Sequence, residues 1–131
     1  MAKAKEAIHS DSAPAAVGPY AQAVAAGDWV FVSGQLGLEP ASGRLVSGGA
    51  AAEARQALAN VRAVLQAAGL ELADVVRTTV YLADIGEFAA VNEVYGEFFS
   101  PPYPARVTVG VAALPRGARV EIEALAYRSK S

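Results

Sequence analysis

The chain of 131 residues contains no cysteine and one histidine. Without cysteine there is no disulfide framework, thiolate nucleophile, zinc-thiolate site or iron–sulfur cluster. A single histidine, His9, excludes a metal site built from several histidine ligands. A serine nucleophile normally needs a histidine base, and no P-loop, G-x-S-x-G or H-E-x-x-H motif is present in a suitable context. If the chain is an enzyme, its acid–base groups are therefore carboxylates, tyrosines or lysines.

Charge is also scarce in this sequence. Charged residues make up 18% of the chain, the net charge is −2, and the 11 basic residues are scattered. Nucleic-acid-binding domains normally carry a basic patch, so we expect no nucleic-acid partner. No apolar run reaches the length of a membrane span, and no signal-peptide pattern opens the chain. We therefore expect a cytoplasmic protein without a membrane partner.

The residue patterns that are present predict one α+β domain. Residues 1–16 are polar and alanine-rich and are expected to be a loose lead-in, whereas residues 17–131 are expected to form the domain. Gly27-Asp28, between two β-rich runs, predicts a hairpin. Strands are predicted from β-rich or alternating runs at 20–26, 29–33, 75–83, 106–112 and 119–128.

Two helices are predicted between these strands. Apolar residues recur at helical spacing over 50–68 and 86–99, and Gly69 is placed to end the first helix. This order predicts a mixed β-sheet with two helices packed on one face. The strands are too apolar for the other face to meet water, so we expect self-association to cover the open face.

Arg106 is the most informative single residue. It begins an apolar strand, on the side that carries only Thr108 and Gly110. A buried arginine needs an anion, which is either an internal carboxylate or the carboxylate or phosphate of a ligand. The internal candidates are Glu121 and Glu123, which alternation places on one face of the last strand. From these patterns both alternatives stay open.

Other polar residues have two interpretations each. Asn92 borders the apolar face of the second helix, and a buried amide there would bond either to backbone or to a ligand. Taken alone, Tyr20 fits a core aromatic residue and Ser33 a strand end. Gly34 fits a turn, with a phosphate cradle as the weaker alternative.

Taken together, five short motifs in order along the chain resemble the RidA/YjgF family of reactive intermediate (enamine/imine) deaminases. The resemblance covers the chain from about Ile8 to Arg128. No one motif is decisive, but five in this order are specific. They are Gly18-Pro19-Tyr20-Ala21-Gln22-Ala23, Val32-Ser33-Gly34-Gln35, Val91-Asn92-Glu93-Val94-Tyr95, Pro104-Ala105-Arg106, and Leu114-Pro115 with Val120-Glu121-Ile122-Glu123-Ala124.

The resemblance implies both an architecture and an activity. The implied fold is chorismate-mutase-like, assembled as a homotrimer with a central barrel and with clefts between subunits. The implied reaction is hydrolysis of 2-imino acids, such as 2-iminobutanoate and 2-iminopropanoate, to 2-oxo acids and ammonia. It implies neither a metal nor a cofactor.

Site residues follow from the resemblance by position. Arg106 would bind the substrate carboxylate, and Glu121 would hold and activate the attacking water. Tyr20 is grouped with them as a catalytic candidate that lines the cleft. The substrate-binding candidates are Ser33, Gly34, Asn92 and Thr108.

Two alternative functions belong to different classes. One is a non-catalytic ligand-binding or regulatory member of the same superfamily, whose usual sign is loss of the arginine that Arg106 supplies here. The other is an endoribonuclease or translation inhibitor. The acidic charge balance and the lack of an RNA-binding motif weigh against it.

Overall fold

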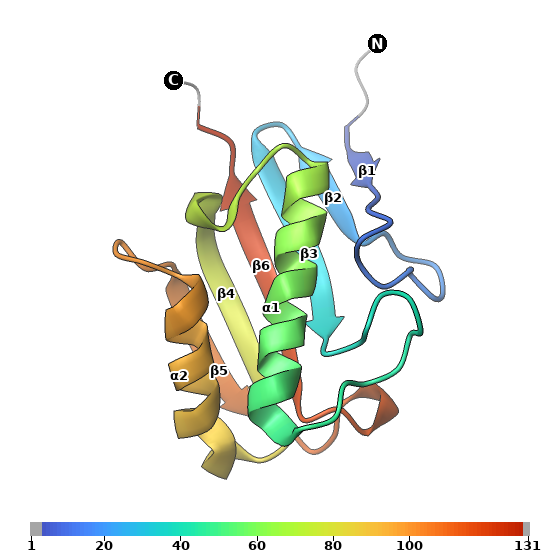
Figure 1. The fold of residues 1–131 in the computed structure, drawn as a ribbon. Coiled ribbons are helices and arrows are strands. Elements are labelled where there is room, and N and C mark those ends of the chain that lie inside the picture. The colour runs from blue at the N-terminus through green and yellow to red at the C-terminus, as the bar shows by residue number, and fades with distance from the viewer. Residues whose placement is uncertain (1–3, 130–131) are drawn as a thin grey trace.

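Six strands form one mixed sheet in the computed structural model, which describes residues 4–129 (Figure 1). The strand order is β1-β2-β3-β6-β4-β5. Strands β4 and β5 run parallel, and the other neighbouring pairs run antiparallel. The strands are β1 (Glu6–Ile8), β2 (Ala23–Ala26), β3 (Trp29–Leu36), β4 (Val75–Leu82), β5 (Ala105–Gly110) and β6 (Val120–Tyr127).

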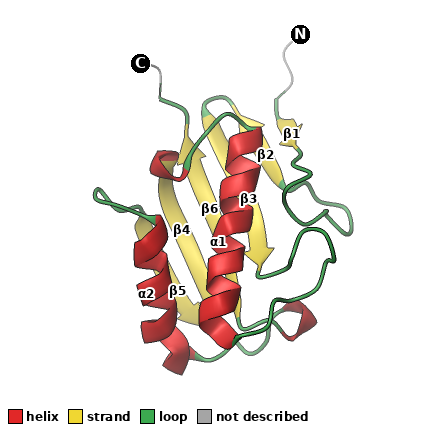
Figure 2. Ribbon diagram, viewed as in Figure 1, coloured by secondary structure: helices red, strands yellow, loops and turns green. Residues whose placement is uncertain are grey.

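Two helices cover the same face of this sheet (Figure 2). Helix α1 (Gly49–Ala67) packs on β3 and β6, and α2 (Phe88–Phe98) packs beside α1. At the end of α1 the chain turns at Gly69, where a φ of 77° favours glycine. Short 3₁₀ turns lie at Leu72–Asp74, Ile85–Glu87 and Pro115–Gly117. The predicted mixed sheet with two helices on one face is confirmed.

Strand alternation creates the core between the sheet and the helices. On β6, Val120 and Ile122 are fully buried, and the intervening glutamates point to the other face. The α1 stripe meets them with Leu58, Val61 and Leu65, which are also fully buried. The periodicities of the sequence therefore identify the two surfaces that pack together.

The N-terminal segment differs from the loose lead-in expected over residues 1–16. Strand β1 pairs antiparallel with β2, and Ser10 and Ala13 are buried. The side chain of Gln22 holds the segment: its oxygen accepts from the Ser10 N–H (2.6 Å), and its amide donates to the carbonyls of Ser10 (3.1 Å) and Pro14 (2.8 Å). A strand of three residues is too short to show an alternating pattern, which explains the error. Residues 1–3 of that segment lie outside the described residues.

The sheet face opposite the helices carries large apolar side chains. Phe31 is 50% exposed and Val107 is 51% exposed. At one end of this face the rings of Trp29 and Tyr127 lie 4.7 Å apart. The expected open apolar face is thus present in a single subunit. Across residues 4–129, the helices fall short of the length and apolar character needed to cross a bilayer.

Candidate active site

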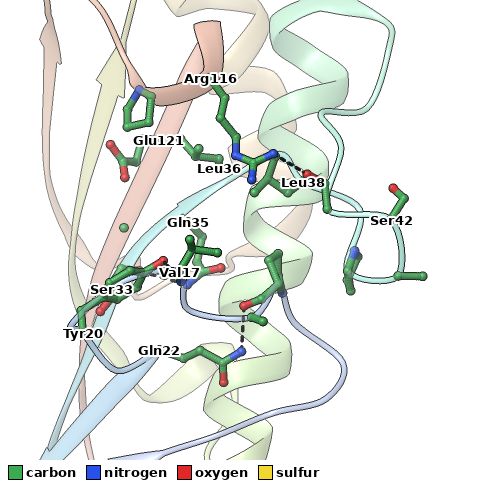
Figure 3. Close-up of a pocket in the computed structure, with 17 residues that line it drawn as sticks. Val17, Tyr20, Gln22, Ser33, Gln35, Leu36, Leu38, Ser42, Arg116 and Glu121 are labelled. Carbon is green, nitrogen blue, oxygen red and sulfur yellow. Dashed lines mark hydrogen bonds between the residues drawn. The ribbon is translucent and has the colours of Figure 1, made fainter.

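Six of the seven predicted site residues line two separate cavities. Tyr20, Ser33, Gly34 and Glu121 line a cavity of about 790 Å³ on the open side of the sheet (Figure 3). Asn92 and Arg106 line a smaller cavity of about 430 Å³ beside α2, together with Tyr95, Gly96, Tyr103 and Pro104. One chain therefore holds the predicted site residues in two separate groups, which we call half-sites.

The larger cavity is built where β3 loses its regular pairing with β6. The register shifts between Val32 and Gln35, so Ser33 and Gly34 sit in an irregular stretch. The Ser33 hydroxyl donates to the Ala21 carbonyl (2.6 Å), which fixes the preceding loop to the strand. Its hydroxyl proton is thus used in the fold. Tyr20, 54% exposed, stands at the cavity edge, and its hydroxyl accepts weakly from the Val17 N–H (3.4 Å).

Gly34 lies so close to the Glu121 carboxylate that a side chain at this position would displace it. A Cβ at this position would collide with Oε2 of Glu121 and would lie 2.9 Å from its carboxyl carbon. The backbone of Gly34 is outside the left-handed region, so steric space is the reason for glycine here. The phosphate-cradle alternative finds no support, because a carboxylate occupies the space beside Gly34.

Glu121 and Glu123 lie on the same face but have different surroundings. Glu123 accepts a hydrogen bond from the Tyr81 hydroxyl (2.5 Å). Glu121 has no hydrogen-bond donor or ion-pair partner among the described residues. Burial, and then the negative charge of Glu123, raise the pKa of Glu121 above its ordinary value. A free carboxylate with a raised pKa is suited to accept a proton.

Arg106 lies on the helix side of the sheet. Its guanidinium carbon is 4.7 Å from the centroid of the Tyr95 ring and 5.6 Å from that of Phe88. Tyr95 is itself fixed by a buried hydrogen bond of 2.7 Å between its hydroxyl and Thr78 Oγ1. Aromatic faces hold a guanidinium in place without neutralising it.

The internal salt bridge considered for Arg106 is wrong. Glu121 and Glu123 project from the opposite face of the sheet, and no described carboxylate forms an ion pair with Arg106. Its planar group is thus available for an external anion. A carboxylate matches the guanidinium in two-point geometry.

Asn92 lines the smaller cavity, whereas Thr108 lines neither of the two cavities. Asn92 is exposed, so the expectation of a buried amide is wrong. It lies on the outer side of α2, where its amide faces the small cavity. Thr108 follows Arg106 by two positions on β5 and is half-buried on the same side.

Three residues of these half-sites were missed by sequence reasoning. Phe88 and Tyr95 belong to an apolar helix stripe and were interpreted as core, although their spacing of seven places them on one face. Arg116 lines the large cavity and donates to the Gly43 carbonyl (2.7 Å), which ties two loops at its rim. The φ of Arg116 is 60°, which is unusual for a residue with a side chain. This feature marks the residue only in the folded backbone, so the sequence alone could not have pointed to it.

No group of three or more His, Asp or Glu side chains arranged to bind a metal ion occurs in the described part of the chain. The chemistry of the two cavities is therefore argued from their own side chains. These are a carboxylate in one half-site and a guanidinium in the other.

Comparison with known proteins places this arrangement in a family. The model of the family described as endoribonuclease L-PSP matches residues 10–128. The 2-iminobutanoate/2-iminopropanoate deaminase of Bos taurus is 53% identical over 124 residues, which cover 95% of this chain and 90% of the bovine one. Protein DfrA of Myxococcus xanthus is 54% identical over 94% of this chain and 95% of its own.

Solved structures agree with this relationship. RidA from the Antarctic bacterium Psychrobacter sp. PAMC 21119 is 49% identical, with a TM-score of 0.90 over 93% of this chain and 98% of that one. E. coli TdcF, solved with bound serine, is 42% identical with a TM-score of 0.90, and the match covers 95% of this chain and 99% of TdcF. The chain belongs to the endoribonuclease L-PSP family, the family also called YjgF/RidA.

Gly34→Ala tests the contact that builds the first half-site. The added methyl group should push the Glu121 carboxylate aside with only a small change in the free energy of unfolding, because the end of a flexible side chain can move. A crystal structure and chemical denaturation of the variant measure both effects. Gly96→Ala is the control, because a Cβ there meets nothing within 4 Å and the helix gains stability. An unmoved Glu121 carboxylate in Gly34→Ala would contradict the steric argument.

Proposed function

We propose that this chain hydrolyses reactive 2-imino acids, such as 2-iminobutanoate and 2-iminopropanoate, to 2-oxo acids and ammonia. The observation that carries the proposal is Arg106, whose guanidinium lies over two aromatic rings and forms no ion pair with a carboxylate within residues 4–129. The deaminase name carried by relatives at 52–54% identity supports the same reading. The serine in the E. coli relative has an α-carboxylate, the group that Arg106 is proposed to bind.

The proposed reaction needs few catalytic groups. A protonated imine is already electrophilic at C2, so an oriented water molecule can attack without a covalent nucleophile. As the water oxygen bonds to C2, the Glu121 carboxylate accepts its proton. The proton then passes from Glu121 to the amine of the tetrahedral intermediate. As the C–N bond breaks, the C2 hydroxyl gives its proton back to Glu121 and becomes the carbonyl of the 2-oxo acid. That proton finally leaves with ammonia as ammonium, which restores the carboxylate. General-base help of this kind is typically worth about 10²–10⁴ in rate.

The proposal includes a homotrimer with clefts between subunits. In one subunit the sheet separates Arg106 from Glu121, so no single substrate can reach both. Strand β5, which carries Arg106, lies at the edge of the sheet, and the neighbouring open face is apolar. Packing three open faces into a central barrel covers that surface and lets the Arg106 half-site of one subunit meet the Glu121 half-site of the next. Tyr20, Ser33, Asn92 and Thr108 are proposed to line this shared cleft.

The alternatives receive less support from the two cavities. A ligand-binding member without catalysis would not need a free carboxylate of raised pKa opposite the anion site. An RNA substrate would call for a basic channel. Among the described residues that line the larger cavity, the basic side chain is Arg116, which is bound to a carbonyl. The cytoplasmic location expected from the sequence stays a prediction.

Arg106→Lys is expected to reduce imine turnover strongly although the charge is kept. An ammonium cannot reproduce the planar two-point contact with a carboxylate. Arg106 is exposed in the single chain, so the expectation of a buried arginine is wrong. Arg106→Ala, which also removes the charge, should lose at least as much turnover as Arg106→Lys. An amino-acid oxidase assay that follows imine decay measures both variants. Arg62→Lys is the matched control, since Arg62 also stacks on a phenyl ring, at 5.3 Å, but lines neither cavity. Near-native turnover by Arg106→Lys would refute the carboxylate contact.

Glu121→Gln should bind 2-oxo acids but turn over imines about 10²–10⁴ times more slowly, because the amide cannot accept the water proton. Glu123→Gln should stay within a few-fold of the parent at neutral pH. In the parent, turnover should fall as the pH drops through the raised pKa of Glu121, since protonation removes the base. Equal losses in the two variants would show that the carboxylates act as one unit.

A further inference from the structure

We propose that Tyr81 is a positioning residue that selects Glu121 as the water-activating base. It does so by donating its hydroxyl to Glu123, which engages one of two neighbouring carboxylates and leaves the other free. This inference rests on the proposed function, but its geometry can be tested without activity.

Strand register brings the three side chains together. In the antiparallel β4–β6 pair, Tyr81 stands directly opposite Glu121, and Thr79 stands opposite Glu123. The Tyr81 hydroxyl nevertheless reaches diagonally to Glu123 Oε1, at 2.5 Å. Diagonal contacts of this kind are within reach of an aromatic side chain on one face of a sheet. Glu121 therefore has the ring of Tyr81 beside it, while the hydroxyl proton goes to its neighbour.

Tyr81 and Glu121 both respond electrostatically to this arrangement. The hydrogen bond to Glu123 is the main cause that raises the pKa of Tyr81, followed by burial and the two glutamates' charges. Glu121 and Glu123 are two residues apart on a strand, about 6.7 Å along the chain. At that separation the two negative charges compete, and a proton on either one relieves the other. The Tyr81 hydroxyl stabilises the charge on Glu123.

The other hydroxyl on this face of β4 belongs to Thr79, opposite Glu123, and its hydrogen bond acts on Tyr81, whose pKa it lowers. On the same face of β4, Arg77 stands opposite Leu125, further from Glu121 along the sheet. Arg116 and Tyr20 line the cavity, but Arg116 is bound to the Gly43 carbonyl. Strands β3 and β5 present no titratable side chain on this face within the described residues. The asymmetry between the two glutamates thus depends on Tyr81.

Two substitutions should move the pKa of Glu121 in opposite directions. In Tyr81→Phe, Glu123 loses the donor that offsets its charge, so Glu121 should titrate about half to one pH unit higher. In Glu123→Gln the like charge is removed, so Glu121 should titrate about one pH unit lower. Tyr127→Phe is the control: it removes a hydroxyl from the same face at the Trp29 end and should leave the titration unchanged.

The measurement is a carbon-13 NMR titration of the glutamate carboxyls in the full chain, with the Glu121 signal assigned by its loss in Glu121→Gln. The acid limb of kcat/KM for imine turnover should shift in the same directions. Opposite shifts in Tyr81→Phe and Glu123→Gln support the inference, and an unmoved Glu121 titration in Tyr81→Phe overturns it. If the titrations shift as expected but the parent chain turns over no imine, the positioning by Tyr81 stands and the proposed function fails.

Discussion

The β-sheet that separates Arg106 from Glu121 is the constraint on which the rest of the structure depends. Strand β5 turns Arg106 toward α2, and β6 turns Glu121 toward the open face. Side chains alternate between the two faces along a strand, so moving either residue to the other face would require a register shift of one residue that reverses every side chain of that strand. A cation and a base on opposite faces cannot serve one small substrate within a subunit. In the proposed trimer, self-association would both complete the site and cover the apolar surface.

The partly buried position that raises the pKa of Glu121 also makes its charged form unfavourable for folding. A raised pKa means that the folded state binds the Glu121 proton more tightly than the unfolded chain does. The stability contributed by that proton is fully present below the unfolded pKa and is lost as pH rises through the folded pKa. At neutral pH an ionised Glu121 thus works against folding. Gly34 makes room for it, and the free guanidinium of Arg106 is supported by rings in place of an internal anion.

Sequence patterns predicted the elements well because their signals are local. The stripe of α1 and the alternation of β6 follow from residue spacing alone, and both are confirmed. The Tyr81–Glu123 contact could not be predicted, since it depends on the register of two strands that lie about 40 residues apart. The support of Arg106 by Tyr95 was missed for a related reason. An aromatic residue in an apolar stripe is normally core, and its contact with β5 appears only in the packed structure.

Subunit complementation tests the shared cleft most directly. Arg106→Ala and Glu121→Gln subunits, each nearly inactive alone, can be refolded together and their mixed assembly checked by native mass spectrometry. Suppose that each site takes Arg106 from one subunit and Glu121 from its neighbour. In an equal mixture that assembles at random, about half of the first subunits keep Arg106 and about half of their neighbours keep Glu121. About a quarter of the sites then have both residues, so about a quarter of parent activity should return. Mixed trimers that remain as inactive as the separate variants would contradict a site made by two subunits.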